Sequence, residues 1–248
     1  MKMNTANDLW LSALALVALV IGCGTNQPAA AADKNDDVIA IDILLQPDAT
    51  MLKRAAAVNE QLRKDFPKGF SLDASHRPHV TLVQRYVRTG DLDKVYAAVG
   101  KALDSAHVTS LKLEAFKYYY IADGPLGLQG IVVKSTPELL KVQQTVVDAV
   151  TPFVVKNGTA AAFVPPAEGS IVPALVEYVE VFVPDHSGEH YMPHVTTGLA
   201  RKEYLDKMAA EPFDSFTFSP VGAAVYHLGN YGTATTKLHE FVLKRSYK

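Results

Sequence analysis

The chain has 248 residues, of which 48% are hydrophobic and 20% are charged, a composition typical of a globular protein. This composition excludes disordered, collagen-like and coiled-coil proteins, and the length is sufficient for a buried core without a structural metal or disulfide. The 24 basic and 26 acidic residues give a net charge of −2, so the chain as a whole does not attract polyanions. A single cysteine, Cys23, can form no intramolecular disulfide.

The first 22 residues are predicted to be a signal peptide. An uncharged apolar run from Leu9 to Ile21 follows a short polar start, and it is too short to cross a membrane comfortably. The sequence Val20-Ile21-Gly22-Cys23 resembles a bacterial lipobox, in which the cysteine becomes the lipidated first residue of the mature protein. We therefore expect residues 1–22 to be removed and Cys23 to carry a lipid anchor.

Residues 23–37 are rich in Ala, Asn and Asp and are predicted to form a flexible tether. The glycine after Cys23 resembles an outer-membrane address, so we expect an exported, periplasmic lipoprotein of the outer membrane. The alternative is ordinary cleavage within Gln27–Asp33, which contains an Ala-x-Ala pattern and would release an exported soluble protein.

The folded domain is expected to span residues 38–248, and its first part alternates strands with helices. The apolar runs Val38–Leu45 and His79–Val87 have the character of strands. Each is followed by a segment with helical spacing, Ala49–Phe66 and Leu92–Ala106. The sequence therefore begins with two strand–helix pairs.

A hairpin and a third helix are predicted next. Residues 111–121 and 128–134 flank the turn signal Asp123–Gly127, which favours a hairpin. Helical spacing returns over Pro137–Val150, with Thr136 placed as the N-terminal cap.

The second part repeats this plan after an interruption. Residues 151–173 contain four prolines and two glycines and are predicted to be an irregular insertion. Strands are expected over Leu175–Val183, His194–Thr197, Phe216–Leu228 and Thr236–Leu243, with a helix over Lys202–Ala210. The sequence thus predicts an α+β domain of two pseudo-repeated lobes.

A repeated tetrapeptide marks the candidate catalytic residues. Pro78-His79-Val80-Thr81 recurs as Pro193-His194-Val195-Thr196, 194 − 79 = 115 residues later. Residues i and i+2 of a strand face the same way, so each copy presents an imidazole and a hydroxyl on one face and its valine on the other. If the two strands lie close together, two histidines and two threonines converge on one cleft.

Two histidines and two hydroxyls suit phosphoryl transfer. Because imidazole titrates near neutral pH, one histidine can accept a proton while the other donates one. The hydroxyls can donate hydrogen bonds to phosphoryl oxygens as negative charge develops. A Ser-His-Asp triad is less favoured, since the sequence has no G-x-S-x-G elbow.

The two H-x-T motifs, on strands of a duplicated α+β domain, resemble the 2H phosphoesterase superfamily, which includes the bacterial RNA 2′,3′-cyclic phosphodiesterases often labelled 2′-5′ RNA ligases. The resemblance covers residues 38–248 and implies two lobes of antiparallel sheet with outer helices and a central cleft. It implies that His79 and His194 are the acid–base pair and that Thr81 and Thr196 hold the phosphate. A metal-independent cyclic phosphodiesterase with no cofactor is therefore expected.

The implied substrate is a cyclic-phosphate nucleotide or a short RNA end; no protein partner is expected, and contact with the membrane is expected only through Cys23. The alternative is a non-catalytic lipoprotein that binds a phosphorylated ligand in the same cleft. Two further residues are candidates for substrate binding: Arg85, at even spacing from His79, and Tyr191, just before the second motif.

Two weaker patterns are also present. His186, His190 and His194 are spaced like metal ligands on a helix, but Pro184, Gly188 and Pro193 argue against a helix there. We therefore expect a loop that enters the second motif and no metal. The tyrosines at 118–120 are expected to pack more often than to stack on a base.

Overall fold

The computed structural model describes residues 37–243, so the predicted signal peptide, nearly all of the tether including Cys23, and residues 244–248 lie outside the described residues. The strands are β1 (Val38–Pro47), β2 (Val80–Arg88), β3 (Leu113–Asp123), β4 (Leu126–Val133), β5 (His194–Arg201), β6 (Phe216–Phe218), β7 (Pro220–Leu228) and β8 (Ala234–Phe241). The α-helices are α1 (Ala49–Asp65), α2 (Leu92–Ser105), α3 (Pro137–Val150), α4 (Pro173–His186) and α5 (Lys202–Ala210).

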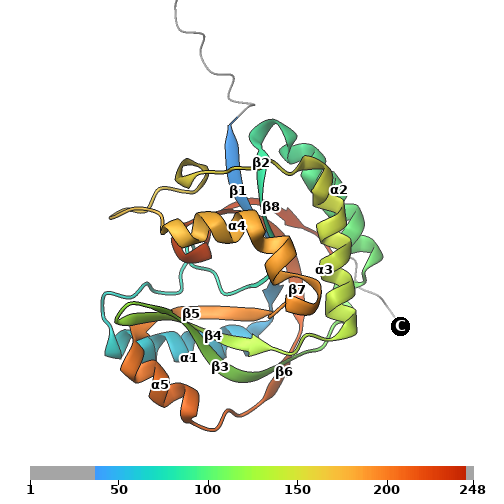
Figure 1. Ribbon diagram of the computed structural model, residues 1–248. Helices are drawn as coiled ribbons and strands as arrows, with labels where there is room; N and C mark the ends of the chain where they lie inside the picture. The colour runs from blue at the N-terminus through green and yellow to red at the C-terminus, as the bar shows by residue number, and fades with distance from the viewer. Residues whose placement is uncertain (1–36, 244–248) are drawn as a thin grey trace, which may run out of the picture. The chain divides into compact units, whose positions relative to one another are not determined.

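The strands form two four-stranded sheets, in the orders β2-β1-β7-β8 and β5-β4-β3-β6. Every pairing within them is antiparallel. Helices pack on the outer faces of both sheets (Figure 1). This confirms the expected fold class, an α+β domain with two lobes of antiparallel sheet and outer helices.

The two lobes are interleaved in sequence. The sheet that holds the first motif pairs β1 and β2 from the start of the domain with β7 and β8 from its end. The other sheet pairs the β3–β4 hairpin with β5 and β6. Each motif strand, β2 or β5, lies at the edge of its sheet, and the two motifs therefore sit on different sheets.

Helix α1 illustrates how local sequence signals fix the elements. The Asp48 side chain caps it by accepting hydrogen bonds from the backbone N–H groups of Thr50 (3.0 Å) and Met51 (3.4 Å). A third bond, from the Ser219 backbone N–H at 2.8 Å, joins this cap to the segment before β7. The start of α1 is thus tied to a strand that is distant in sequence.

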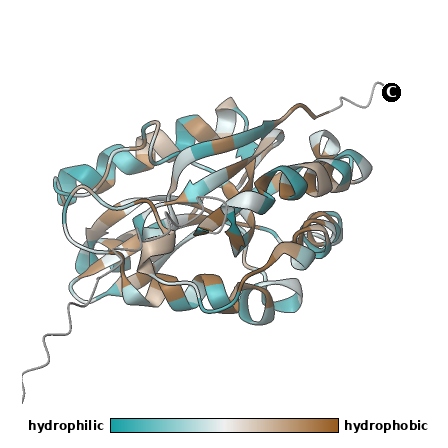
Figure 2. Ribbon diagram, turned by 90° about the horizontal axis from the view of Figure 1, so that it is seen from above, coloured by the Kyte–Doolittle hydropathy of each residue, from teal (hydrophilic) through white to brown (hydrophobic). Residues whose placement is uncertain are grey.

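Strand β1 separates the core from the cleft. Its residues Ile41 and Ile43 are fully buried in the main hydrophobic core, which includes residues of α2 and α3. On the opposite face, Ala40 packs with residues of α4 in a second cluster. In Figure 2 the helices alternate brown and teal along their length, as expected for amphipathic helices that cover a sheet.

The strand predicted over Leu175–Val183 is wrong, because this segment belongs to α4. The run is rich in β-branched residues, which favour strands, but its buried residues Leu175, Val179 and Phe182 recur with helical spacing. Pro173 provides a favourable first helical residue. Tertiary burial of one face has therefore overridden intrinsic propensity.

Pro184 also fails to end the helix where expected. It lies inside α4, which continues to His186. His186 is thus the last residue of α4, His190 ends a short 3-10 helix, and His194 begins β5.

The region before α4, residues 151–172, contains two short 3-10 helices and no α-helix or named strand, consistent with an irregular segment. Across residues 37–243, no helix combines the length and apolar character needed to cross a membrane.

Candidate active site

Each motif strand carries a β-bulge directly after its threonine. In β2, Thr81 pairs with Leu44 and Val83 with Ile43, so Leu82 is an extra residue. In β5, Thr196 pairs with Gly130 and Gly198 with Gln129, so Thr197 is extra. Bulges re-aim side chains and often lie beside active sites. The duplication therefore extends from the tetrapeptides to the backbone that follows them.

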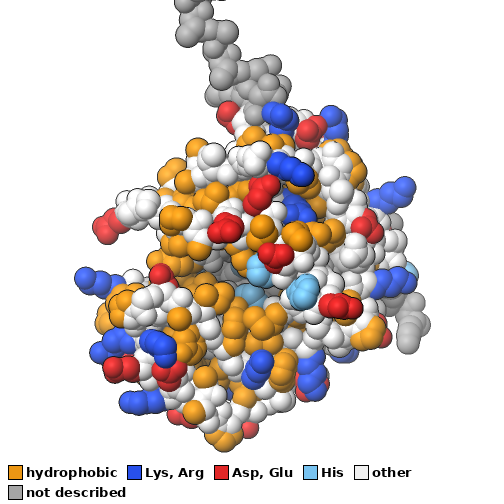
Figure 3. Space-filling model, viewed as in Figure 1, with side chains coloured by type: hydrophobic (Ala, Val, Ile, Leu, Met, Phe, Trp, Pro, Cys, Tyr) orange, Lys and Arg blue, Asp and Glu red, His pale blue; other side chains and the backbone are white. Residues whose placement is uncertain are grey.

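The two motifs line one cavity with a volume of about 340 Å³ between the sheets and α4. His79, Thr81, His194 and Thr196 all contribute to its wall, as their spacing predicted. Figure 3 looks onto this face, where histidine side chains lie in a hollow bordered by hydrophobic side chains. The central cleft expected from the sequence is present.

His79 lies between two hydrogen-bond acceptors. Its Nδ1 is 2.6 Å from the carbonyl oxygen of Arg77, and its Nε2 is 3.2 Å from Oδ2 of Asp42. Burial by itself lowers the pKa of His79, but the hydrogen bond and negative charge of Asp42, helped by the Arg77 carbonyl, outweigh it and raise the pKa above its usual value. A doubly protonated imidazolium satisfies both acceptors.

His194 has the opposite electrostatic environment. Its Nδ1 is 2.9 Å from the carbonyl oxygen of Met192, which fixes the proton on Nδ1 and leaves Nε2 as a lone-pair acceptor. Burial lowers the pKa of His194, and the positive charge of His79 adds to this effect, against the Met192 hydrogen bond and the charge of Asp42. Tyr119 packs edge-on against the ring, with centroids 5.0 Å apart.

Asp42 is a residue of this site that the sequence analysis missed. Its side chain is fully buried in β1, and Oδ2 accepts hydrogen bonds from the Thr81 hydroxyl at 2.7 Å and the Gln84 amide at 3.1 Å in addition to His79. Its Oδ1 has no hydrogen-bond partner within residues 37–243. A single acidic residue in the apolar run VIAIDILL was the available signal, because a buried carboxylate needs compensating partners.

The two motif threonines differ in the same way as the histidines. Thr81 donates its hydroxyl hydrogen to Asp42, so in this arrangement it cannot also donate to a phosphate, contrary to the role implied by the family resemblance. Thr196 lines the cavity, and no hydrogen bond of its hydroxyl is found within the described residues. Only the second threonine is therefore free to donate to a ligand.

Tyr191 joins the second motif to the first. It lines the cavity, as predicted, and its hydroxyl donates a 2.6 Å hydrogen bond to the backbone carbonyl of Thr81. Burial raises the pKa of this hydroxyl far above its usual value, so it remains a donor. Of the three tyrosines at 118–120, only Tyr119 lines the cavity, whereas Tyr118 packs on Phe213.

Arg85 does not line the cavity, so its predicted position on the His79 face is wrong. The bulge at Leu82 reverses the alternation of β2, and Gln84 takes the cavity face instead. Arg85 pairs with Ile41, a core residue, and its Nε is buried with no hydrogen-bond partner in the part of the chain that the structure describes. Even spacing in a strand does not hold across a bulge.

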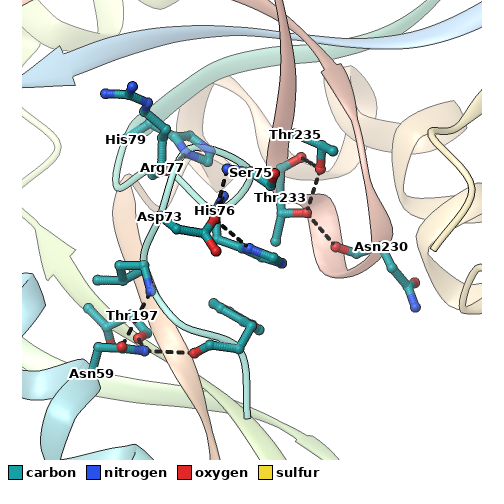
Figure 4. A network of polar contacts seen from close by, with 12 residues as sticks. Asn59, Asp73, Ser75, His76, Arg77, His79, Thr197, Asn230, Thr233 and Thr235 are labelled. Carbon is teal, nitrogen blue, oxygen red and sulfur yellow. Dashed lines mark hydrogen bonds and ion pairs between the residues drawn. The ribbon is translucent and has the colours of Figure 1, made fainter. Parts of the chain in front are cut away.

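A buried asparagine of α1 links β5 to the loop that precedes the first motif. Asn59 of α1 donates from Nδ2 to the carbonyl oxygens of Thr197 (2.8 Å) and Phe70 (3.0 Å) and accepts from the Leu72 backbone at 3.3 Å. Figure 4 shows Asn59 between the bulge residue of β5 and the loop that leads to His79. One side chain thus positions the loop before the first motif relative to the bulge after the second.

The cavity also contains the two histidines considered as metal ligands. His186 and His190 line it with His194, although each comes from a different element. Among residues 37–243, no three His, Cys, Asp or Glu side chains are grouped in a way that could hold a metal ion. Burial lowers the pKa of His186, and the positive charge of His190 contributes, so His186 favours its neutral form.

No protein-family model and no curated protein matches this sequence. Among solved structures, the chain is similar to TT0787 of Thermus thermophilus, with a TM-score of 0.50 and 15% identity over 84% of this chain and 100% of that chain. E. coli LigT complexed with NADP+ gives a TM-score of 0.41 with 13% identity, over 84% of this chain and 99% of that chain. A phosphoesterase gives 0.38 with 13% identity, over 83% and 99%. The similarity to TT0787 shows a shared fold.

Proposed function

We propose that this protein is a metal-independent phosphoesterase that opens 2′,3′-cyclic phosphates of nucleotides or RNA ends. The observation that carries the proposal is that two His-x-Thr motifs line one cavity while the pKa values of their histidines are shifted in opposite directions. Two titratable groups whose environments push their pKa values apart supply one proton donor and one acceptor near neutral pH.

In this proposal His194 is the general base. With Nδ1–H held by the Met192 carbonyl, the Nε2 lone pair takes a proton from water as the water oxygen attacks phosphorus. The lowered pKa of His194 keeps this nitrogen unprotonated at neutral pH. The edge-on contact with Tyr119 restrains the ring and so fixes the direction of the lone pair.

His79 is the general acid. As the bond from phosphorus to the leaving ribose oxygen breaks, the Nε2–H proton passes to that oxygen, which gives a 2′-phosphate and a free 3′-hydroxyl. The 3.2 Å separation between Nε2 and Asp42 is long for a charge-assisted bond, so this hydrogen can be shared with a ligand. Thr81 and Gln84 still donate to the Asp42 carboxylate when His79 releases it.

Thr196 is the hydroxyl that donates to a phosphoryl oxygen. Negative charge accumulates on the non-bridging oxygens in the transition state, and a donor aimed there stabilises it. After one turnover His194 is protonated and His79 is neutral. Exchange of one proton with solvent at each ring restores the starting state.

The test is hydrolysis of a 2′,3′-cyclic nucleotide by the full-length protein in excess chelator, compared with His79→Ala and His194→Ala. Each substitution is expected to lower kcat by roughly 10²- to 10⁴-fold, since each removes one proton transfer. His76→Ala is a matched control, because His76 bonds to Asp73 and does not line the main cavity. Product analysis identifies the bond that is cleaved.

Turnover that requires both motif histidines and survives chelator supports the proposal. If the folded protein binds the cyclic nucleotide without converting it, the alternative of a non-catalytic phosphate-ligand binder takes its place. Turnover that disappears in chelator and returns with added metal would overturn the metal-independent mechanism.

We also propose that the domain lies outside the cytoplasm, as an outer-membrane lipoprotein anchored through Cys23. The apolar run and the lipobox-like sequence before Cys23 support this location. Labelling with radioactive palmitate, followed by membrane fractionation, should give a labelled outer-membrane protein that loses its label in Cys23→Ser. A protein that is exported but unlabelled would instead favour cleavage within Gln27–Asp33.

A further inference from the structure

The cavity has no strong cationic side chain in its wall. Among the described residues that line it, none is Lys or Arg, although 24 such residues occur in the chain. Proteins that hold RNA strands contact successive phosphates with Lys and Arg, and these contacts dominate the affinity. The proposed catalytic site is therefore unlike a surface that binds a polyanion.

The charges that do surround the cavity are negative or balanced. The imidazolium of His79 faces the buried carboxylate of Asp42, so this pair adds no net positive charge. Helix α4 forms one wall with Leu175, Tyr178 and Phe182, whereas its acidic residues do not line the cavity, and Glu180 accepts a hydrogen bond from the Asn157 backbone N–H. Asp123, at the end of β3, lies in the opposite wall. A phosphate beyond the reacting one therefore meets no Lys or Arg among the described residues of this wall.

Arg77 is the cation nearest to the first motif in sequence, but it does not line the cavity. It lines a much smaller hollow that adjoins the cavity at His79 and Thr196. The hydrogen bond from Lys237 lowers the pKa of Glu240 on β8, and the charge of Arg77 adds to this effect. In Figure 4 the Arg77 guanidinium points away from the polar network around Asp73 and Thr233. One arginine cannot replace the row of contacts that an RNA strand needs.

The remaining wall is aromatic and aliphatic. Leu128, Leu175 and Phe182 line the cavity together with Tyr119 and Tyr178. Burial raises the pKa of both tyrosines far above the usual value, so neither becomes an anion. Such a wall is complementary to an organic group rather than to a charged backbone.

The rim is apolar as well. Ile121 and Met192, two of the five large hydrophobic residues that are exposed among the described residues, border the cavity with 52% and 44% of their surfaces exposed. They extend the apolar wall to the surface, where a bound organic group can cover them. The volume of about 340 Å³ lies at the small end of the range for ligand pockets, so it admits one small molecule.

We propose that the substrate is a small cyclic phosphate ester that carries a single negative charge and an aromatic or apolar organic group, and that an RNA strand is a poor substrate. This inference rests on the phosphoesterase function proposed above. The reacting phosphate accepts hydrogen bonds from His79 and Thr196, and the organic group packs against the wall formed by Leu175, Phe182 and Tyr178.

Matched substrates test this directly with the full-length protein. Glycerol 1,2-cyclic phosphate and phenylethanediol cyclic phosphate share the reacting ring and the charge but differ in the phenyl group. We expect kcat/KM to be roughly tenfold or more higher for the phenyl compound, because its ring is buried on binding. A tetranucleotide ending in a 2′,3′-cyclic phosphate should be slower than the corresponding cyclic mononucleotide at every salt concentration.

Two substitutions of exposed hydrophobic residues, one at the rim and one elsewhere on the surface, test whether the rim itself binds the organic group. Ile121→Ser should lower kcat/KM severalfold more for the phenyl compound than for the glycerol compound. Val221→Ser, on β7 away from the cavity and 64% exposed, should change neither. A faster reaction with the tetranucleotide, rising as salt falls, would overturn the inference while leaving the phosphoesterase intact. If none of these cyclic phosphates is opened, the proposed function itself fails.

Discussion

The two motifs have the same four residues and the same bulge after the threonine, yet their side chains have different neighbours. In the first motif, His79 and Thr81 both bond to the buried carboxylate of Asp42. In the second, His194 keeps only its bond to a backbone carbonyl, and the Thr196 hydroxyl faces the cavity. The difference comes from the neighbouring strand. Strand β1, beside β2, contains Asp42, whereas β4, beside β5, contains no acidic residue.

This difference shows how one duplicated sequence can supply two opposite proton-transfer roles. A symmetrical site would give both imidazoles the same pKa, and at neutral pH they would share one protonation state. A single acid on a neighbouring strand raises the pKa of His79, while burial and the charge of His79 lower that of His194. In the proposed mechanism, this asymmetry makes His79 the acid and His194 the base.

Replacing the acid should have the largest effect on this comparison. Asp42→Asn removes the charge that raises the pKa of His79, so the proton donor is lost at a lower pH and the alkaline limb of the pH–kcat profile should move to lower pH. Near neutral pH, kcat should fall roughly 10- to 100-fold, as expected for loss of one charge-assisted hydrogen bond. The pH profile of steady-state hydrolysis of a cyclic nucleotide measures both.

The acidic limb serves as the internal control for this variant. It reports His194, on which the charges of Asp42 and His79 act in opposite directions, so it should move much less than the alkaline limb. Imidazole titration by NMR in the same variant should give a lower pKa for His79 and a nearly unchanged one for His194. An alkaline limb that stays in place would show that Asp42 does not control the proton donor.

Substitutions of the two threonines should lower activity less than Asp42→Asn, and their effects should differ from each other. Thr196→Val removes the free donor and should lower kcat/KM by about tenfold without moving either limb. Thr81→Val removes a hydrogen bond that competes with His79 for Oδ2 of Asp42, so the pKa of His79 should rise and the alkaline limb should move to higher pH. Equal effects of the two substitutions on the pH profile would contradict the proposed asymmetry.

Much of the fold could be predicted from the sequence because its elements follow local rules. Pro137–Val150 was predicted with its observed ends, since a threonine cap and a proline at the first helical position mark its start. Leu175–Val183 could not be assigned in this way. Its valines favour a strand more strongly than Pro173 and the spacing of its apolar residues favour a helix, and burial of one face against Tyr86 and Phe163 stabilises the helix.

The residues of the site that lie in the repeated tetrapeptide could be predicted from the sequence. The residues whose place depends on strand register could not. The four motif residues were found because a tetrapeptide recurs in strands. Asp42 was missed because nothing in the sequence states that β1 lies beside β2 with Asp42 opposite Gln84. Bulges leave no clear sequence signal, and one bulge at Leu82 was sufficient to move Arg85 off the cavity face.

Substitution of Arg85 should have the smallest effect, and comparison with its neighbour Gln84 tests the bulge directly. Because Arg85 lies outside the cavity, Arg85→Met should leave kcat and KM within about twofold, and loss of a buried, unpaired guanidinium nitrogen should change the free energy of unfolding by less than about 1 kcal/mol. Gln84→Leu, one residue earlier, should lower kcat about threefold and move the alkaline limb upward, because Gln84 donates to Asp42. In a regular strand, the even spacing from His79 would place Arg85 in the cavity and Gln84 outside it. A loss of activity in Arg85→Met but not in Gln84→Leu would therefore indicate that β2 has no bulge. Kinetics and urea denaturation of the two neighbouring variants therefore determine on which face of β2 the site continues.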